Sequence, residues 1–267
     1  MRRLLLAGLL LAFLVAGLGA AACDSEEKVA DKPPTSESTE PAASPTPSQE
    51  RQWSFHGQRG ITAVFVPADL ALYRSLLPAA FDMPEAPLVA ISVVNYYDVT
   101  LPLTPYSEGY VVMQCRYQGR TGWYVLTMPV DDEVANAGGR YLGFPKYVAD
   151  EIDLSDTEGA WSGRVAHQGR DVMRVEFTPQ SGSMPVERSS SDPGLPIFLL
   201  VPPGEGPQVN EVNLELFGPR RTVTIVGSAT IEADAAEAWA GLLPADGAAS
   251  ATLDETMGEW VLSGTPE

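Results

Sequence analysis

The chain is short of cysteine and histidine, and these shortages exclude several classes of site. Cys23 and Cys115 are the two cysteines, and His56 and His167 are the two histidines, among 267 residues. No cluster of these residues has metal-ligand spacing, so we predict no metal site and no cofactor. We expect Cys115, which lies in a strand-like run, to be a buried and unreactive thiol.

Positive charge is also scarce. After residue 50 the sequence has 28 acidic and 13 basic residues, a net charge of −15. Such a surface repels nucleic acid and anionic lipid headgroups, so we predict no DNA or RNA partner. An anionic small ligand would need a local cation rather than the field of the whole protein.

Lysine is the scarcest basic residue, because Lys146 is the one lysine after residue 50. Burial can make a lysine amine neutral, and the neutral amine can attack a carbonyl group, which arginine does not do. Lys146 lies in an apolar setting, between Phe144-Pro145 and Tyr147-Val148. Two interpretations remain open on this pattern alone: a reactive buried amine, or a lysine whose stem covers apolar surface while its head reaches water.

The first 22 residues are typical of an export signal, with Met1-Arg2-Arg3 before an apolar run at 4–18 that is too short for a confident membrane span. Ala20-Ala21-Ala22-Cys23 resembles the end of a bacterial lipoprotein signal, which implies that Cys23 becomes a lipid-bearing N-terminus. We therefore expect an exported protein of the cell envelope, anchored to the membrane by Cys23. Ala20 replaces the usual leucine, and a three-alanine site also suits an ordinary signal peptidase, so a secreted soluble protein is the alternative.

The remaining sequence divides into a linker at 23–50 and one domain at 51–267. The linker is rich in Pro, Ser, Thr, Glu and Ala and has no apolar periodicity, so it cannot bury enough surface to fold. The domain alternates short β-branched and aromatic runs with turn signals, which predicts a mainly β structure with a few short helices. We expect strands at 61–66, 88–99, 110–117, 123–130, 146–154, 160–167, 172–178, 196–201, 210–217 and 222–231, helices at 68–77 and 235–243, and a loop at 179–194.

The residues before Lys146 predict a turn that leads into a strand. Gly143 permits an unusual backbone conformation, Pro145 fixes its own φ angle, and Phe144 before it is restricted to extended conformations. The segment Gly138 to Lys146, read Gly-Gly-Arg-Tyr-Leu-Gly-Phe-Pro-Lys, resembles the Gly-Arg-Glu-x-x-(Gly/Ala)-(Phe/Tyr)-Pro-Lys segment of acetoacetate decarboxylases. Weaker resemblances extend over residues 53–245, including Trp53 to Arg59 and Tyr106-Ser107-Glu108-Gly109.

This resemblance implies a fold and a site. The fold would be an antiparallel, cone-shaped β-barrel with short helices. Lys146 would be the Schiff-base lysine, and Arg59 and Glu108 would be the polar pair that shares its cavity. In the mechanism that the family implies, Lys146 condenses with the carbonyl group of a small oxo acid, Arg59 orients the carboxylate, and Glu108 assists proton movement.

Three departures from the family pattern bear on the substrate. A second lysine of the family is replaced by Tyr147, a glutamate of the Gly-Arg-Glu run by Arg140, and a second cavity glutamate by Ser92. Neighbouring residues of a strand face opposite ways, so Tyr147 need not affect how Lys146 is activated. The change at Ser92 alters what the cavity can hold and protonate.

The sequence thus predicts a lyase that resembles acetoacetate decarboxylase and acts on a small oxo acid through Lys146. A hydro-lyase or aldolase-type reaction on the same scaffold is one alternative. A lipoprotein that binds a carbonyl or apolar ligand without turnover is another. Assembly into a homo-oligomer is left open.

Overall fold

The structure, a computed structural model, describes residues 54–201 and 208–266. The predicted signal peptide, Cys23 and the linker at 23–50 lie outside the described residues. None of the helices in the described ranges is long and apolar enough to cross a membrane.

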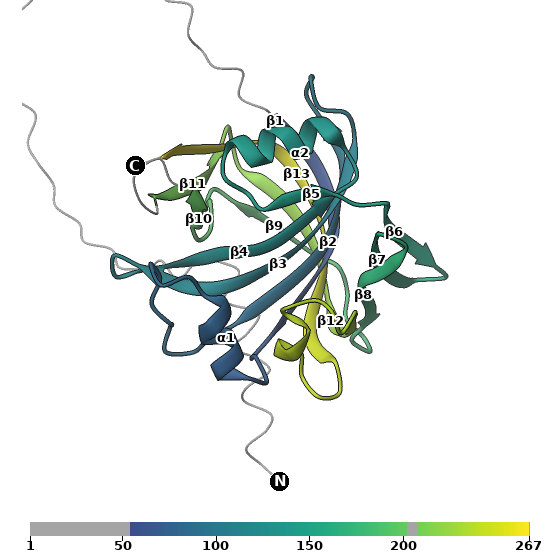
Figure 1. Ribbon diagram of the computed structural model, residues 1–267. Helices are drawn as coiled ribbons and strands as arrows, with labels where there is room; N and C mark the ends of the chain where they lie inside the picture. Colours follow the sequence, from purple (N-terminus) through teal and green to yellow (C-terminus); the bar gives the residue numbers. More distant parts are fainter. Residues whose placement is uncertain (1–53, 202–207, 267) are drawn as a thin grey trace, which may run out of the picture. The chain divides into compact units, whose positions relative to one another are not determined.

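Seven strands form a closed ring of hydrogen-bonded neighbours (Figure 1). In ring order they are β1 (Ser54–Phe65), β2 (Val89–Val99), β3 (Tyr106–Tyr117), β4 (Arg120–Val130), β10 (Ile197–Val201), β11 (Gln208–Leu216) and β13 (Ala248–Pro266), which returns to β1. Each neighbouring pair is antiparallel except β4 and β10, which run parallel.

A second layer of strands branches from the ring at β13. There β12 (Arg220–Ala233) pairs with β13 and with β8 (Arg170–Pro179), and the order continues through β7 (Ala160–His167) to β6 (Glu151–Thr157). β9 (Val186–Ser190) pairs with the first part of β12. The helix α1 (Leu70–Leu76) begins at an Asp69 cap, whose carboxylate accepts a bond from the Leu72 N–H.

Side chains alternate between the two faces of β1, β2 and β3, and this alternation separates two apolar regions. One face, with Ile61, Val93 and Val111, packs against β7, β8 and α1 in the largest core. The other face points into the ring. Its apolar side chains form two smaller clusters, one around Val112 and Leu199 and the other around Phe55, Tyr106 and Trp260.

The connection between β4 and β5 positions Lys146. Two parallel strands need a crossover between them, and here it contains the helix α2 (Glu133–Tyr141). The Asp132 carboxylate caps this helix by accepting the Ala135 N–H at 2.7 Å. The strand β5 (Lys146–Val148) then runs parallel to β4, and α2 lies beside both strands in Figure 1.

The mainly β prediction is confirmed, while several element assignments were wrong. The sheet is mixed rather than wholly antiparallel, because β4 pairs in parallel with β5 and β10. The strand predicted at 146–154 is two strands, β5 and β6, and the predicted loop at 179–194 contains β9. Where a helix was predicted at 235–243, the structure has only a short 3₁₀ turn, Ala240–Leu242. Neither α2 nor β13 was predicted.

Candidate active site

The backbone before Lys146 has the turn that the sequence predicted. Gly143 has a φ of 95°, in the region that favours glycine, and the buried Phe144 follows it. Asn210 of β11 holds the end of α2, because its side-chain amide donates to the Leu142 carbonyl at 2.7 Å. Lys146 then begins β5 opposite Met128, so its side chain points into the ring with that of Met128.

The Lys146 amine lies against the Glu108 carboxylate inside the ring. Lys146 Nζ is 2.7 Å from Glu108 Oε2, and the two side chains are only 7% and 5% exposed. The amine also lies 5.5 Å from the centroid of the Tyr106 ring, within the range of a cation–π contact. Two predicted site residues, from β3 and β5, therefore meet as a buried pair of opposite charge.

Because Gly139 of α2 has no side chain, the aliphatic part of the Lys146 side chain can pack directly against the helix. A Cβ atom on Gly139 would lie 2.4 Å from Lys146 Cδ and 2.5 Å from Cε, far inside van der Waals contact. Glycine is unfavourable inside a helix, by about 1 kcal/mol relative to alanine. The helix thus contains an unfavourable glycine at a point where α2 comes close to the Lys146 side chain.

Tyrosines complete the surroundings of Glu108. The Tyr96 hydroxyl donates to Glu108 Oε1 at 2.9 Å, so the two carboxylate oxygens contact different groups. Burial, and then the nearby Glu108 charge, raise the pKa of Tyr96 and of Tyr106 well above the ordinary value. Burial also raises the pKa of Tyr110 to about 12. These phenols therefore stay protonated at neutral pH and can donate hydrogen bonds.

Arg59 lies elsewhere, and the expectation that it shares a space with Lys146 and Glu108 was wrong. The pairing of β1, β2 and β3 aligns Gly60 with Glu108. Arg59, one residue earlier in β1, pairs with Asn95, so its side chain faces the opposite side of the sheet from Glu108. Arg59 Nη2 contacts Glu255 Oε1 at 2.7 Å, and the guanidinium carbon lies 5.4 Å from the centroid of the Trp161 ring. Both chain neighbours of Arg59 lie on the inner face, and of these Gln58, which pairs with Tyr96, is the one with a side chain.

The three departures from the family pattern have different surroundings. Ser92 is fully buried on the inner face, where its hydroxyl lies 2.8 Å from that of Thr62. Tyr147 faces away from Lys146 and contacts His167, with ring centroids 4.6 Å apart. Arg140 is an exposed residue in the last turn of α2.

Cys115 is a free and fully buried thiol, as expected. Burial raises the pKa of Cys115 to about 12, so the thiol stays protonated at neutral pH.

Sequence reasoning missed Tyr96, Tyr106 and Gly139 as parts of this site. Tyr106 had a readable signal, because it lies two residues from Glu108 and so shares its face of a strand, whereas Tyr96 lies on a different strand. Gly139 had none, since a glycine pair in a weakly apolar segment argues against a helix.

The fold and this pair define a class: a β-rich protein whose closed ring of strands encloses a lysine paired with a carboxylate. The profile of one family, described as acetoacetate decarboxylase (ADC), matches residues 33–252. The chain therefore belongs to the acetoacetate decarboxylase family.

Individual relatives are similar over different lengths. Acetoacetate decarboxylase of Ralstonia nicotianae is 37% identical over 82 residues, which are 30% of this chain and 32% of that protein. The match thus spans about a third of the curated relative. The crystal structure of acetoacetate decarboxylase from Legionella pneumophila has a TM-score of 0.61 and 19% identity, and covers 83% of this chain and 93% of that one.

A similar fold also occurs in an enzyme with a different name. MppR, an enduracididine biosynthesis enzyme, has a TM-score of 0.61 and 17% identity in a complex with the condensation product of pyruvate and imidazole 4-carboxaldehyde, covering 82% of this chain and 90% of that one. At these identities the structural likeness shows the fold alone.

Proposed function

We propose that the protein is a lyase that forms a Schiff base between Lys146 and a small oxo acid, with decarboxylation as the leading reaction. The observation that carries this proposal is the buried contact, 2.7 Å long, between Lys146 Nζ and Glu108 Oε2. A nucleophilic amine needs a neighbouring base and a dry environment, and this pair supplies both.

The first step is a proton transfer. Opposite charges at this distance stabilise each other, so the ammonium must lose a proton before its nitrogen can attack. Glu108 Oε2 accepts that proton, while the Tyr96 hydroxyl continues to hold Oε1. The reactive amine is thus produced by its partner, in place of the lone uncharged lysine that the sequence suggested.

The covalent steps then follow from the chemistry of an imine. Lys146 Nζ bonds to the carbonyl carbon of a 3-oxo acid, and the carbonyl oxygen leaves as water after taking one proton from the lysine nitrogen and one from Glu108. This leaves a protonated imine and a Glu108 carboxylate. The carbon–carbon bond to the carboxylate breaks, its electron pair moves into the protonated imine, and carbon dioxide leaves. A proton from solvent adds to the enamine carbon, and water then hydrolyses the imine, which releases the ketone and restores the amine. Arg59 has no direct part in these steps, because it lies on the other face of the sheet.

A second reaction on the same scaffold is a specific rival. The complex of MppR contains a condensation product of pyruvate and an aldehyde, which is a bond-forming outcome. Ser92, with its hydroxyl against Thr62, replaces a carboxylate of the family pattern on the inner face. An aldolase-type or hydro-lyase reaction of an oxo acid at Lys146 is therefore the second candidate, and binding without turnover is the third.

One experiment separates the three. The protein is incubated with acetoacetate and, separately, with pyruvate alone or with an aldehyde. Borohydride then reduces any imine, and the modified peptide and the released carbon dioxide are measured. Carbon dioxide release together with an adduct on Lys146 supports decarboxylation. An adduct without carbon dioxide favours the rival reaction, and no adduct with either acid contradicts Schiff-base chemistry. Lys146→Arg is the control, since it keeps the charge and removes the nucleophile.

We also propose export to the cell envelope and anchoring by a lipid on Cys23, on the strength of the N-terminal sequence alone. Labelling of growing cells with a fatty-acid analogue should mark the full chain and not Cys23→Ser. An unlabelled wild-type chain in the medium would favour the secreted alternative. Assembly into a homo-oligomer stays a prediction that light scattering can test.

A further inference from the structure

A hollow lies on the outer face of the ring, away from Lys146. Its volume is about 330 Å³, at the small end of the range for ligand pockets. The polar and aromatic residues that line it come from β1, β2 and β13 and from the β6–β7 hairpin: Arg59, Asn95, Tyr97, Asp156, Trp161 and Glu255. Arg59 and Asn95 face away from the row that contains Glu108, so the sheet itself separates this hollow from the candidate active site.

The polar groups of the hollow include both donors and acceptors. Arg59 Nη2 and the Tyr97 hydroxyl both donate to Glu255 Oε1, at 2.7 and 3.3 Å. The Asn95 amide nitrogen donates to Ser107, which leaves its carbonyl oxygen as an acceptor. Arginine carries five N–H donors, and the described residues take one of them here.

Aromatic and aliphatic surface lies beside these groups. The Trp161 ring is partly exposed and lies 5.4 Å from the Arg59 guanidinium carbon, and Leu154 lines the same hollow. Tyr97 is 39% exposed. A flat aromatic ring next to hydrogen-bonding side chains suits a ligand with one apolar and one polar side.

The charges of the hollow disfavour an ionic ligand of either sign. The Arg59 charge is already compensated by Glu255 at 2.7 Å. An anion would be repelled by Asp156 and Glu255, in a protein whose net charge is −18. A cation at the Trp161 ring would meet the guanidinium of Arg59. A neutral ligand whose hydroxyl groups both donate and accept avoids both penalties.

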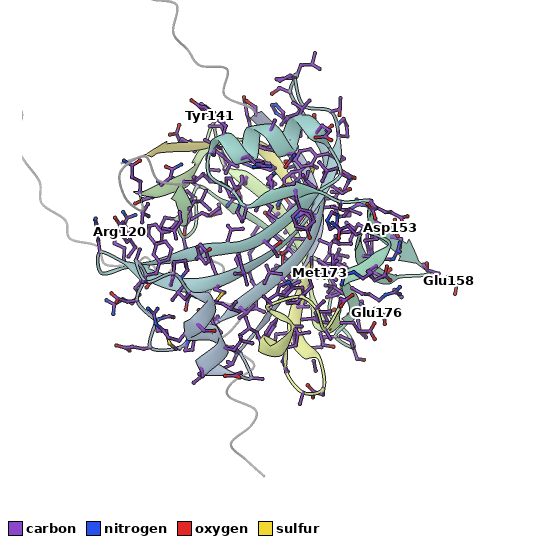
Figure 2. The ribbon with its side chains drawn as sticks, viewed as in Figure 1. Arg120, Tyr141, Asp153, Glu158, Met173 and Glu176 are labelled. Atoms are coloured by element: carbon purple, nitrogen blue, oxygen red, sulfur yellow. The ribbon has the colours of Figure 1, made fainter. Side chains whose placement is uncertain are left out.

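We propose that this hollow binds a neutral sugar ring. The C–H side of the sugar packs against Trp161 and Leu154, beside the Arg59 guanidinium, and its hydroxyl groups bond to Arg59, Asn95 and the two carboxylates. The hollow extends to the β6–β7 hairpin, whose tip at Glu158 projects from the body in Figure 2. The proposal is independent of the chemistry at Lys146.

Saturation-transfer NMR on the full chain tests it, with the methyl glycosides of glucose, galactose and N-acetylglucosamine as probes. We expect at least one probe to bind with a Kd on the order of 1 mM, as suits a ligand of this size that binds in an open hollow. Trp161→Ala should weaken that binding at least tenfold, and Trp161→Phe less. Arg59→Ala should also weaken it, which keeps the test valid if the tryptophan variant does not fold.

Arg120→Ala is the matched control, because Arg120 forms an ion pair with Glu211 at the β3–β4 hairpin, across the view from Glu158 in Figure 2. It should leave sugar binding unchanged, and so should Lys146→Arg. Failure of all three glycosides to bind would overturn the proposal. So would equal losses in Arg59→Ala and Arg120→Ala. Acetate or tetramethylammonium that binds through Arg59 or Trp161 in place of the glycosides would overturn the ligand class.

Discussion

Removing one member of the Lys146–Glu108 pair should cost far more stability than removing both. Glu108→Gln leaves an ammonium without a counter-charge in a position that is 7% exposed, and Lys146→Met leaves a carboxylate that is 5% exposed. Breaking a buried pair in this way costs about 3–5 kcal/mol. The double variant has neither charge, so its loss should be well below the sum of the two single losses. The coupling energy should therefore be on the order of 3 kcal/mol.

Urea unfolding of the four proteins in this cycle measures the coupling, provided that the m value stays constant. The Arg120–Glu211 pair supplies the reference, since its bonds of 2.7 and 2.8 Å are equally short but its side chains are 57% and 24% exposed. Exposed pairs contribute about 0.2–1 kcal/mol. If the Lys146–Glu108 coupling is no larger than that of the exposed pair, then amine and carboxylate do not meet in a dry interior, and the site as described is wrong.

Three further predictions concern single positions. Gly139→Ala should reduce the yield of borohydride-trapped adduct at Lys146 at least tenfold, because the new methyl group takes the space of the lysine stem; an unchanged yield would refute that contact. Tyr147→Phe should leave the same yield within about twofold, since Tyr147 contacts His167 on the opposite face of the strand; a large loss would place Tyr147 in the site. Stability should fall as the pH rises above 9, because burial raises the pKa of Cys115 from 9.0 to about 12. The contribution of the neutral thiol is complete below pH 9 and is lost between pH 9 and 12, at about 1.4 kcal/mol per pH unit. Urea unfolding of wild type and Cys115→Ala should show a steeper alkaline decline in wild type, and equal slopes would contradict the assignment.

The position of Lys146 was predictable because local rules decide it. Gly143, Pro145 and the apolar residues after them predict a turn followed by a strand, and the structure has both, with φ of 95° at Gly143 and β5 from Lys146. Lys146 is also the one lysine after residue 50, which singles out this side chain in the sequence. That Lys146 shares a space with Glu108 was expected only from the family resemblance, because the two residues are 38 positions apart in the chain, and their direct ion pair was not predicted.

Arg59 was placed in the site by the family resemblance, and its true position shows how sensitive such an assignment is to register in a strand. Side chains alternate with a period of two, so an assignment that is wrong by one residue changes the face. The pairing of β1 with β2 is irregular between Phe55 and Gln58, just before Arg59. Such an irregularity leaves no reliable mark in a single sequence.

The helix α2 was missed for a different reason. Gly138 and Gly139 each disfavour a helix by about 1 kcal/mol, so local preference pointed to a loop. What favours the helix is its Asp132 cap and its packing over β4 and β5, where Gly139 admits the lysine stem. A tertiary contact thus overrides local preference at a position next to the candidate site.

The most direct test of the central claim is peptide mapping after incubation of the full chain with acetoacetate and borohydride. The account predicts a reduced imine on Lys146, with Lys28 and Lys32 unmodified as internal references in the same molecule. Modification of Lys28 or Lys32 to the same extent, or an unmodified Lys146, would contradict it.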